Sequence, residues 1–305
     1  MSNNTFYPLS VSEIRPETDS AVCITFDVPD ELKEKFRFVQ GQHLTLKTTI
    51  DGEEVRRSYS ICSGVDDGKL QVGIKRIEDG IFSNFANNEL KVKDSIEVMP
   101  PRGEFYTSLD AGNAKNYMCI CAGSGITPIL SIVKSILSRE PLSRVTVLLG
   151  NRNSSTVMFK EDLGFLKNRY MTRLNWLNIL SREQQDAEVL FGRLDNKKGG
   201  ELNKKKLIDI ANTDEFFLCG PESMISDVSR GLRDFGIAES KIHYELFFSS
   251  PEDAQAAIEK HQDRAKRLAG RVSEMNVKVG GRSIHFDLSA DGENILDGAM
   301  RNGAD

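Results

Sequence analysis

The stretch YMCICAGSGITP, residues 117–128, decides the fold of the second half of the chain. Its first six residues form a continuous apolar run, which is typical of a buried strand in a parallel sheet. Gly123 and Gly125 follow this run, and a helical pattern begins at residue 129. Glycines between a strand and a helix let the backbone approach a pyrophosphate, to which the helix N-terminus offers unpaired N–H groups. Gly-x-Gly alone is a weak signal, but in this context it predicts a phosphate-binding loop.

The sequence after this loop continues to alternate between strands and helices. Strand-like runs occur at residues 144–149, 174–180 and 215–219, and the last of them leads through Gly220-Pro221 into a helical run at residues 222–235. Alternating buried strands and helices predict a parallel, doubly wound α/β sheet.

The first part of the chain has a different pattern. Short strand-like runs at residues 44–50, 57–62, 70–77 and 95–99 are separated by turn residues such as Asp51-Gly52. Several short strands at this spacing predict an antiparallel sandwich or barrel. A separate β domain is therefore expected before the α/β domain.

The composition excludes several classes of protein. The chain has 305 residues, with 40 Lys and Arg against 45 Asp and Glu, a net charge of −5 and 39% hydrophobic residues. This balance is typical of a soluble globular protein of about two domains. It argues against a coiled coil, a disordered chain or a strongly basic nucleic-acid binder, so no nucleic-acid partner is expected.

Membrane and export signals are also missing from the sequence. No run reaches the roughly 18 uninterrupted apolar residues that a spanning helix needs, and residues 1–11 lack the pattern of a signal peptide. The five cysteines are scattered without a Cys-x-x-Cys pair, which favours a reducing compartment. A cytoplasmic protein is expected, with no membrane partner and no metal site in this chain.

Two pairs of polar residues end the strands that follow the phosphate-binding loop. They are Asn151-Arg152 and Ser181-Arg182. Strand ends at one edge of an open parallel sheet line its nucleotide crevice, where an arginine can bind a phosphate with two N–H groups. One such arginine alone fits a solvated sheet edge, whereas two beside a phosphate loop indicate nucleotide binding.

The tetrapeptide Arg57-Ser58-Tyr59-Ser60 is a second candidate site, in the β domain. An aromatic ring, hydroxyls and a guanidinium on one strand suit a flat, anionic cofactor. Tyr59 would stack on it, Ser60 would bind the edge of its ring and Arg57 would hold its phosphate. Arg-x-Tyr-Ser is common by chance, so other motifs must support this interpretation.

Seven motifs, in order, resemble those of the ferredoxin–NADP reductase superfamily. They are Arg57-Ser58-Tyr59-Ser60, Ile74-Lys75-Arg76, Gly80-Ile81-Phe82-Ser83-Asn84, Pro101-Arg102-Gly103-Glu104-Phe105, the loop at residues 123–128, Cys219-Gly220-Pro221 and His243-Tyr244-Glu245-Leu246-Phe247. The resemblance implies an antiparallel β-barrel that binds FAD at residues 1–109. It also implies a doubly wound α/β domain that binds NADP at residues 110–248. In one place the chain departs from the pattern, with Gln40-Gly41-Gln42 where Pro-Gly-Gln is common.

The resemblance also assigns residues to the two cofactors. For FAD it implies Arg57, Ser58, Tyr59, Ser60, Ile74, Lys75, Gly80, Phe82, Ser83, Asn84, Thr127 and Phe247. For NADP it implies Gly123, Gly125, Thr127, Pro128, Arg152, Ser181, Arg182, Cys219, Gly220 and Pro221. Residues 82–84 resemble a turn around the FAD pyrophosphate. Ser181-Arg182 resembles a grip on the ribose 2′-phosphate, which favours NADPH over NADH.

Three residues resemble the catalytic residues of the superfamily, namely Ser60, Cys219 and Glu245. Cys219 would lie near the nicotinamide at the point of hydride transfer, and Glu245 would tune the reduced flavin or relay a proton. Thr127 would lie between flavin and nicotinamide. Phe247 would cover the flavin face and move aside for the nicotinamide.

Within the superfamily, the chain resembles the reductase subunits of phenylacetyl-CoA epoxidases. Residues 38–46, 51–61 and 284–305 carry this resemblance. In that group a plant-type ferredoxin domain follows the reductase. Residues 249–272 are therefore expected to be a linker, and residues 273–305 the beginning of a β-grasp domain.

The expected ferredoxin-like segment would contain a hairpin at residues 277–288 and a short helix at residues 295–300. It stops before the cysteines that would bind a cluster. The sequence is therefore expected to be part of a longer protein, and a 2Fe–2S cluster is expected only in that full-length protein.

These resemblances imply a concrete activity. NADPH would give a hydride to FAD, and electrons would pass singly to the oxygenase component of a multicomponent monooxygenase, a phenylacetyl-CoA epoxidase of phenylacetate catabolism. One alternative is the reductase of another oxygenase, such as a ring-hydroxylating or ketosteroid system. A second alternative is a nucleotide-binding interaction module without turnover. The oligomeric state is left open.

Overall fold

The computed structural model describes residues 5–247, 272–279 and 282–289. Residues 5–247 belong to one compact unit, and the two C-terminal segments belong to a second. The larger unit contains two sheets, connected by the loop at residues 103–115. Residues 249–271 of the linker expected at residues 249–272 lie outside the described residues, and Val272 belongs to a strand. The helix expected at residues 295–300 also lies outside the described residues.

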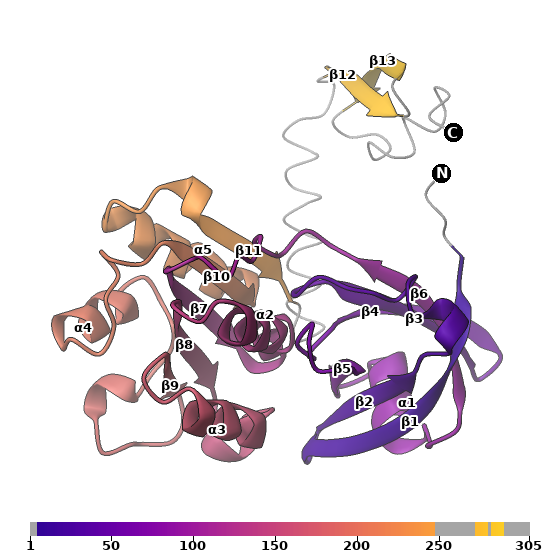
Figure 1. Ribbon diagram of the computed structural model, residues 1–305, viewed down its shortest axis with the longest axis horizontal. Helices are drawn as coiled ribbons and strands as arrows, with labels where there is room; N and C mark the ends of the chain where they lie inside the picture. The colour runs from indigo at the N-terminus through magenta and orange to yellow at the C-terminus, as the bar shows by residue number, and fades with distance from the viewer. Residues whose placement is uncertain (1–4, 248–271, 280–281, 290–305) are drawn as a thin grey trace. The chain divides into compact units, whose positions relative to one another are not determined.

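The first sheet is antiparallel. Its strands, in spatial order, are β4 (Glu53–Ser60), β3 (His43–Ile50), β6 (Ser95–Arg102), β1 (Tyr7–Thr18), β2 (Ala21–Asp27) and β5 (Leu70–Lys75). The outer strands approach each other just beyond β4, where Ile61 pairs with Val72 and the Cys62 N–H donates to the Gln71 carbonyl oxygen at 2.9 Å. The sheet therefore curls into a barrel (Figure 1), and the predicted antiparallel barrel is confirmed.

The β3–β4 hairpin shows how the sequence sets the register of this sheet. Asp51 and Gly52 form its tip, with φ angles of 52° and 83°. A two-residue turn with both φ angles positive matches the twist of the strands, and Asp-Gly is a preferred sequence for it. The resulting register turns Leu44 and Leu46 into the barrel interior, where both side chains are buried.

The second sheet is parallel. Its strands, in spatial order, are β11 (Ile242–Leu246), β10 (Glu215–Gly220), β7 (Asn116–Ala122), β8 (Arg144–Asn151) and β9 (Leu174–Leu180). The helices of this domain are α2 (Ile126–Arg139), α3 (Lys160–Arg169), α4 (Lys198–Lys204) and α5 (Glu222–Asp234). The strand order reverses direction at β7, and ligands of such sheets bind outside the carboxyl ends of the strands at the reversal.

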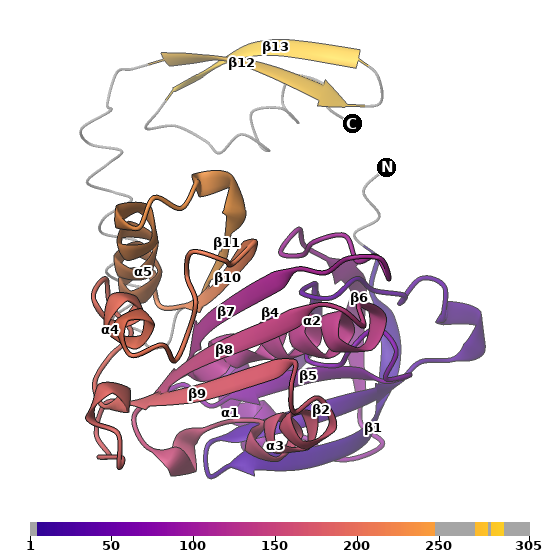
Figure 2. The same cartoon turned by 60° about the vertical axis from the view of Figure 1, so that its left-hand side comes forward.

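Alternate residues of β7 explain why helices cover both faces of the second sheet. Cys119 and Cys121 pack with residues of α2 and α3, whereas Met118 and Ile120 pack with residues of α4 and α5. Because both faces are buried, β7 is apolar from Tyr117 to Ala122. The predicted doubly wound α/β domain is confirmed (Figure 1 and Figure 2).

Some elements differ from the sequence-based expectation. Residues 82–84, expected as a turn, belong to helix α1 (Ile81–Asn88), whose buried Phe82 and Ala86 stand one turn apart. Helix α2 begins at Ile126 rather than at residue 129. The strands β1 and β2 were not predicted, because β1 carries charged residues and Pro16 along its length.

The second unit is a two-stranded antiparallel hairpin. Its strands are β12 (Val272–Val279) and β13 (Arg282–Ser289), paired in register from Val272 opposite Ser289 to Val279 opposite Arg282. The predicted hairpin is confirmed, with longer strands than expected.

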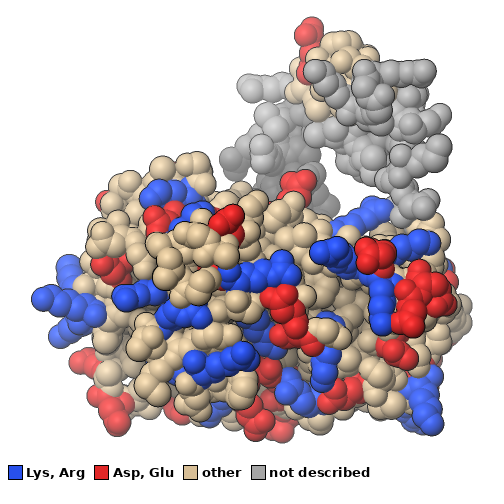
Figure 3. Space-filling model, in the orientation of Figure 1, with Lys and Arg blue, Asp and Glu red and all other residues tan. Residues whose placement is uncertain are grey.

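The surface drawn in Figure 3 carries Lys and Arg side chains intermixed with Asp and Glu side chains. This intermixing agrees with the nearly balanced charge count of the sequence. None of the helices in the described part of the chain combines the length and hydrophobicity that crossing a membrane requires.

Candidate active site

The phosphate-binding loop connects β7 to α2 through a tight turn at Gly123–Gly125. Gly123 has a φ of 55°, in the left-handed region that favours glycine. A Cβ on Gly125 would lie 2.3 Å from the backbone carbonyl oxygen of Cys219, so only glycine lets the loop pass over the end of β10. No described side chain caps the N-terminus of α2, which leaves its N–H groups available to an anion.

Two cations approach this loop without a carboxylate partner. The Lys75 ammonium lies 3.7 Å from the position of a Cβ on Gly123. Burial, and then the charge of Arg152, lower the pKa of Lys75. Among the described residues, no carboxylate lies within ion-pair distance of either cation. An anion between them would relieve their repulsion, which fits a dinucleotide phosphate.

Asn151 is a candidate that the sequence interpretation did not single out as a binding residue. Its Nδ2 group is buried and has no hydrogen-bond partner within the described part of the chain. Buried donors are rarely left unpaired, so a missing ligand is a natural acceptor. Its place at the end of β8, directly before Arg152, was the available signal.

Strand β4 lies at the outer edge of the first sheet, so one side of its backbone is not paired within that sheet. Tyr59 packs its ring against Phe82, with centroids 5.5 Å apart at an interplanar angle of 43°. Arg57 is exposed and donates from Nη1 to the Arg56 carbonyl oxygen at 2.7 Å. Ser58 Oγ lies 3.1 Å from Thr45 Oγ1.

The beginning of α1 is organised by its own side chains. Ser83 Oγ accepts from the Ile77 N–H and donates to the Gly80 carbonyl oxygen, both at 3.1 Å. Asn84 Nδ2 donates to the carbonyl oxygens of Ile77 and Gly80 at 3.1 and 2.9 Å. Phe82 and Ser83 are buried, so the turn expected here is instead a helix N-terminus without a side-chain cap. Its N–H groups, rather than these side chains, suit a diphosphate.

The three expected catalytic residues meet where the two sheets face each other. Ser60 Oγ donates to Glu245 Oε2 at 3.4 Å, which links the end of β4 to β11. Glu245 stands opposite Cys219 in the parallel pairing of β11 with β10. Burial raises the pKa of Glu245 to about 7, although the Ser60 hydrogen bond opposes the shift. This carboxyl group can therefore hold or release a proton near neutral pH.

Cys219 is fully buried in this cluster. Burial, and then the charge of Glu245, raise the pKa of its thiol well above the ordinary value. A thiol that stays protonated is a poor nucleophile. Cys219 is therefore unsuited to act as a nucleophile.

The remaining expected residues differ in their burial. The Phe247 N–H donates to the Gly220 carbonyl oxygen at 2.9 Å, and its half-buried ring packs on the core that also contains Cys219. Thr127 is buried, and its Oγ1 donates to the Ser124 carbonyl oxygen at 3.0 Å. Ile74 lies in the barrel core, so its side chain does not face a ligand.

The residues expected to bind NADP at the strand ends lie side by side. The Ser181 and Arg182 N–H groups donate to the carbonyl oxygens of Asn151 and Arg152 at 2.9 and 2.8 Å. Both arginines are exposed at the same edge of the sheet. Pro128 is buried within α2, and Gly220-Pro221 leads into α5.

The site has the chemistry that FAD and a dinucleotide need. Among the residues that the structure describes, it offers an aromatic ring beside a strand edge, two uncapped helix N-termini, an unpaired buried amide and two cations without a carboxylate partner. Within the described ranges, no group of three or more His, Cys, Asp or Glu residues is arranged to hold a metal ion.

Comparison with known proteins agrees with this geometry. Residues 8–106 match the oxidoreductase FAD-binding domain, and residues 119–230 match the oxidoreductase NAD-binding domain. The chain is 40% identical over 301 residues to a subunit of the 1,2-phenylacetyl-CoA epoxidase of Escherichia coli (strain K12), covering 99% of this chain and 82% of the relative. It is 33% identical to the ferredoxin reductase component of the 3-ketosteroid-9-alpha-monooxygenase of Rhodococcus rhodochrous, covering 89% of this chain and 74% of that protein.

The fold also matches solved structures. The ferredoxin NADP+ reductase from Neisseria gonorrhoeae with bound FAD and NADP superposes with a TM-score of 0.68 at 20% identity, covering 81% of this chain and 100% of that one. At this identity the match concerns the fold alone. Together with the family matches and the 40% identical relative, it places the chain: it belongs to the ferredoxin–NADP reductase family and is an oxidoreductase with an FAD-binding and an NAD-binding domain.

Proposed function

We propose that the protein is an NADPH-dependent flavoprotein reductase that supplies electrons to the oxygenase component of a phenylacetyl-CoA epoxidase. The observation that carries the reductase part is the meeting of Ser60, Cys219 and Glu245 beside the phosphate-binding loop. The acceptor is supported by the 40% identity to a subunit of such an epoxidase.

FAD, when bound, would accept a hydride from the nicotinamide and release its electrons one at a time. The protein would bring the two rings together, so that transfer becomes effectively intramolecular. Glu245 would hold a proton at Oε2 and exchange it through the Ser60 hydroxyl, since the two groups are hydrogen-bonded and the Glu245 pKa is about 7.

The binding roles follow the position of each group. Tyr59 would stack on the flavin, Arg57 would bind its phosphate, and the N-terminus of α1 would receive the rest of its diphosphate. Phe247 would cover the flavin until the nicotinamide displaces it. These roles are supported by the exposed guanidinium, the half-buried Tyr59 ring and the uncapped helix.

The dinucleotide would lie across the phosphate-binding loop. Lys75 and Arg152 would neutralise its phosphates, and Asn151 would donate to one of its oxygens. Arg182 would bind the ribose 2′-phosphate, which would make NADPH the preferred donor. The Arg182 N–H donates to the Arg152 carbonyl oxygen, so the two arginines are neighbours, which supports a role for Arg182 in binding the same dinucleotide.

The proposal also includes a cytoplasmic location and an oxygenase component as the partner. All five cysteines are free and buried, which suits a reducing compartment. The hairpin β12–β13 supports the expected beginning of a ferredoxin-like domain at residues 273–305. The 2Fe–2S cluster of a full-length protein remains part of this proposal.

A reconstitution experiment tests the acceptor. The full-length protein, NADPH, O2 and the oxygenase component of a phenylacetyl-CoA epoxidase should together form the epoxide and water from phenylacetyl-CoA and O2, with one NADPH consumed for each epoxide formed. The 3-ketosteroid 9α-monooxygenase is the competing acceptor, because a reductase of that system is 33% identical to the chain. Product formation with the ketosteroid enzyme and none with the epoxidase would overturn the assignment.

A further inference from the structure

A chain of charged side chains joins the FAD-binding and NAD-binding domains at a second place, which we call the interdomain clamp. Its members are Arg15, Glu17, Asp67, Lys134 and Asp162. Lys134 is on α2, seven residues after Thr127, which puts it about 10 Å along the helix from the phosphate-binding end. The clamp therefore contacts neither the expected flavin residues nor the expected NADP residues.

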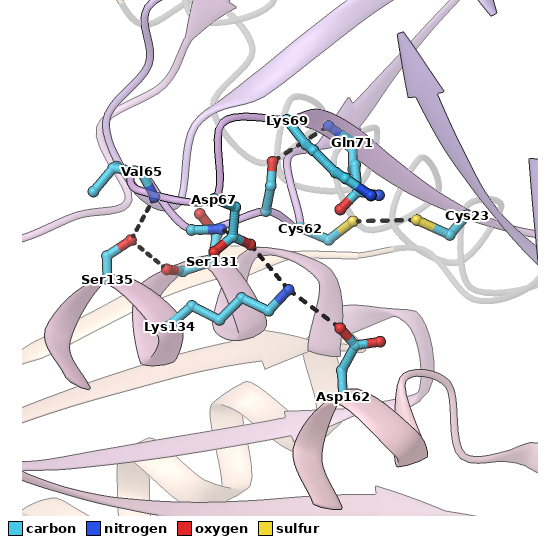
Figure 4. A network of polar contacts seen from close by, with 12 residues as sticks. Cys23, Cys62, Val65, Asp67, Lys69, Gln71, Ser131, Lys134, Ser135 and Asp162 are labelled. Atoms are coloured by element: carbon cyan, nitrogen blue, oxygen red, sulfur yellow. Dashed lines mark hydrogen bonds and ion pairs between the residues drawn. The ribbon is translucent and has the colours of Figure 1, made fainter. Parts of the chain in front are cut away.

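The clamp alternates between the two domains. Lys134 Nζ lies 3.1 Å from Asp67 Oδ2 of the barrel and 3.2 Å from Asp162 Oδ1 of α3 (Figure 4). The other oxygen of Asp162 lies 2.7 Å from Arg15 Nη2, on β1 of the barrel. Lys134 thus ties together one acid from each domain.

Glu17 of the barrel adds one more contact between the two domains to the clamp. Arg15 Nη2 also lies 2.8 Å from Glu17 Oε1. The second oxygen of Glu17 accepts from the Phe159 N–H, at the start of α3, at 2.9 Å. Phe159 itself has a φ of 57°, an uncommon conformation for a residue with a large side chain. The Glu17 carboxylate of the barrel thereby fixes Phe159, the residue that precedes α3.

The centre of the clamp is shielded from solvent, whereas Arg15 and Asp67 are partly exposed. The side chains of Lys134 and Asp162 are 14% and 18% exposed. Burial opposes charge on Asp162, yet Lys134 and Arg15 still hold its pKa below the usual value. Removing one partner of such a pair leaves an uncompensated charge, which is costly in a protein interior.

The two ends of α2 connect the clamp to the active site. Its first turn follows the phosphate-binding loop, and its later turns carry Lys134 and Ser135. Ser135 Oγ accepts from the Val65 N–H at 3.1 Å (Figure 4). Val65 and Asp67 belong to the segment that continues from β4, the strand with the expected flavin residues. The clamp therefore fixes the helix of the NAD-binding domain against the flavin strand.

The backbone of the barrel also lies close to the NAD-binding domain at this boundary. A Cβ on Gly73 of β5 would lie 2.7 Å from Thr127 Cγ2 and 2.8 Å from the Phe159 ring. Glycine at this position lets the barrel touch both the first turn of α2 and the entry to α3. The spacing between the domains is thus set by contact as well as by charge.

We propose that Lys134 is a positioning residue for hydride transfer: by bridging Asp67 and Asp162, it holds α2 at the distance from β4 at which the nicotinamide can stack on the flavin. The inference rests on the proposed function and names a further residue for it. A misplacement of about 1 Å between reacting groups can cost roughly 100-fold in rate, so a distant ion pair can govern the reaction.

The test is anaerobic stopped-flow reduction of the bound flavin by NADPH in Lys134→Met. The matched control is Arg139→Met, on the same helix, which removes an exposed pair with Asp66. Lys134→Met should lower the rate constant for flavin reduction by roughly 10- to 100-fold, with unchanged FAD content and unchanged Kd for NADPH. NADPH deuterated at the transferred position should slow the variant at least as much as the wild type. Arg139→Met should reduce at the wild-type rate.

A second variant removes charge with less disturbance. Asp67 Oδ2 accepts the Gly64 N–H at 2.9 Å, and Asp67→Asn can keep this turn through its amide oxygen. Asp67→Asn should slow flavin reduction less than Lys134→Met, and the double variant should be no slower than Lys134→Met alone, because Asp67→Asn acts only on the Lys134–Asp67 pair that Lys134→Met already removes.

The outcomes separate this inference from the proposed function. A wild-type protein whose flavin is not reduced by NADPH would overturn the proposed function. Reduction of the wild type and of flavin-loaded Lys134→Met at the same rate would overturn only the positioning role. If both Lys134→Met and Asp67→Asn lose FAD or fail to fold, the clamp serves folding and the positioning role is also refuted.

Discussion

The boundary between the two domains is built differently at two of its contact regions. At the active site, Ser60 and Glu245 join the domains through a 3.4 Å hydrogen bond, which is longer than the usual O–H···O distance. At the interdomain clamp, the Arg15–Asp162 and Lys134–Asp67 ion pairs cross the same boundary at 2.7 and 3.1 Å, and the side chains of Lys134 and Asp162 are largely shielded from water. The domains are therefore fastened at the clamp and only lightly joined at the site.

This difference suits a reductase that must admit a nicotinamide between its domains. The ring needs a region where side chains such as Phe247 can move, whereas hydride transfer needs a fixed distance once the ring is in place. Separating the two requirements lets one region open while the other keeps the spacing. Substitutions at the site and at the clamp should therefore have effects of different size and kind. The largest effect on the rate of flavin reduction is expected at the phosphate-binding loop.

Gly125→Ala should have the largest effect on activity, because it acts at the lightly joined region. Its Cβ would lie 2.3 Å from the Cys219 carbonyl oxygen, so the phosphate-binding loop or the end of β10 must move. The rate of flavin reduction by NADPH should fall by at least about 100-fold, with FAD still bound. Stopped-flow absorbance measures both quantities.

The matched control for that prediction is Gly164→Ala in α3, where an added Cβ meets nothing within 4 Å. Alanine in the interior of a helix should raise stability by about 0.5–1 kcal/mol and leave the rate unchanged. Equal rates for Gly125→Ala and Gly164→Ala would mean that the loop is not the NADPH site.

Glu245→Gln should lower turnover with NADPH and a one-electron acceptor by up to about 100-fold, because the amide cannot hold and release a proton. Burial raises the pKa of Glu245 to about 7, so wild-type turnover should change as pH passes through that value. The variant should lack this step in its pH–rate profile. A step retained in Glu245→Gln would assign the titration to another group.

The same carboxyl group should affect stability with a defined sign. The folded protein binds the Glu245 proton more tightly than the unfolded chain, so the stabilisation is complete below the unfolded pKa of about 4.3 and is lost as pH rises through about 7. Glu245→Gln should therefore melt at a higher temperature than the wild type at about pH 8.5 and at a similar temperature at about pH 5. A lower melting temperature at the alkaline pH would contradict the buried position.

Arg182→Ala should have a smaller and more selective effect. Loss of a charged hydrogen bond to the 2′-phosphate should raise the KM for NADPH by about 10-fold or more, with little change for NADH. Steady-state kinetics with both donors measure the ratio. The same change with both donors would remove the 2′-phosphate assignment.

Asp66→Asn should have the smallest effect. Its pair with Arg139 joins the same two domains as the clamp, but the side chains are 46% and 49% exposed. Such a pair contributes about 0–1 kcal/mol, and its loss should leave the rate of flavin reduction unchanged. Chemical denaturation and stopped-flow reduction check the two parts. A rate loss as large as that of Lys134→Met would show that burial does not distinguish the clamp.

The fold could be predicted from the sequence where local patterns are strong. The run at residues 117–122 predicted a buried parallel strand, since burial of both faces keeps the run apolar. Asp51-Gly52 predicted a turn between two strands, since the positive φ angles of the turn favour such residues. Strand β1 was missed because only Leu9 and Val11 are fully buried along it. A turn was predicted at residues 82–84, because they resemble the turn around the FAD pyrophosphate in the family. The helical spacing of the apolar Phe82 and Ala86 was given less weight.

Parts of the site were predicted from the residues themselves, but the pairing of Ser60 with Glu245 was predicted only through the family resemblance. Ser60 and Glu245 are separated by 185 residues, and no periodicity brings them together. Lys75 was expected to bind FAD through the same resemblance, whereas Asn151 became a binding candidate only through its burial without a partner, which depends on packing. Lys134, Asp67 and Asp162 each look like ordinary surface charges in the sequence, and only the docking of the two domains joins them.

The central claim is that NADPH reduces FAD where the phosphate-binding loop meets Ser60, Cys219 and Glu245. Anaerobic mixing of the FAD-loaded protein with one equivalent of NADPH tests it most directly. The flavin absorption band should bleach in the wild type and persist in FAD-loaded Gly125→Ala over the same time. A wild-type flavin that stays oxidised, or bleaching at the same rate in both proteins, would contradict the account.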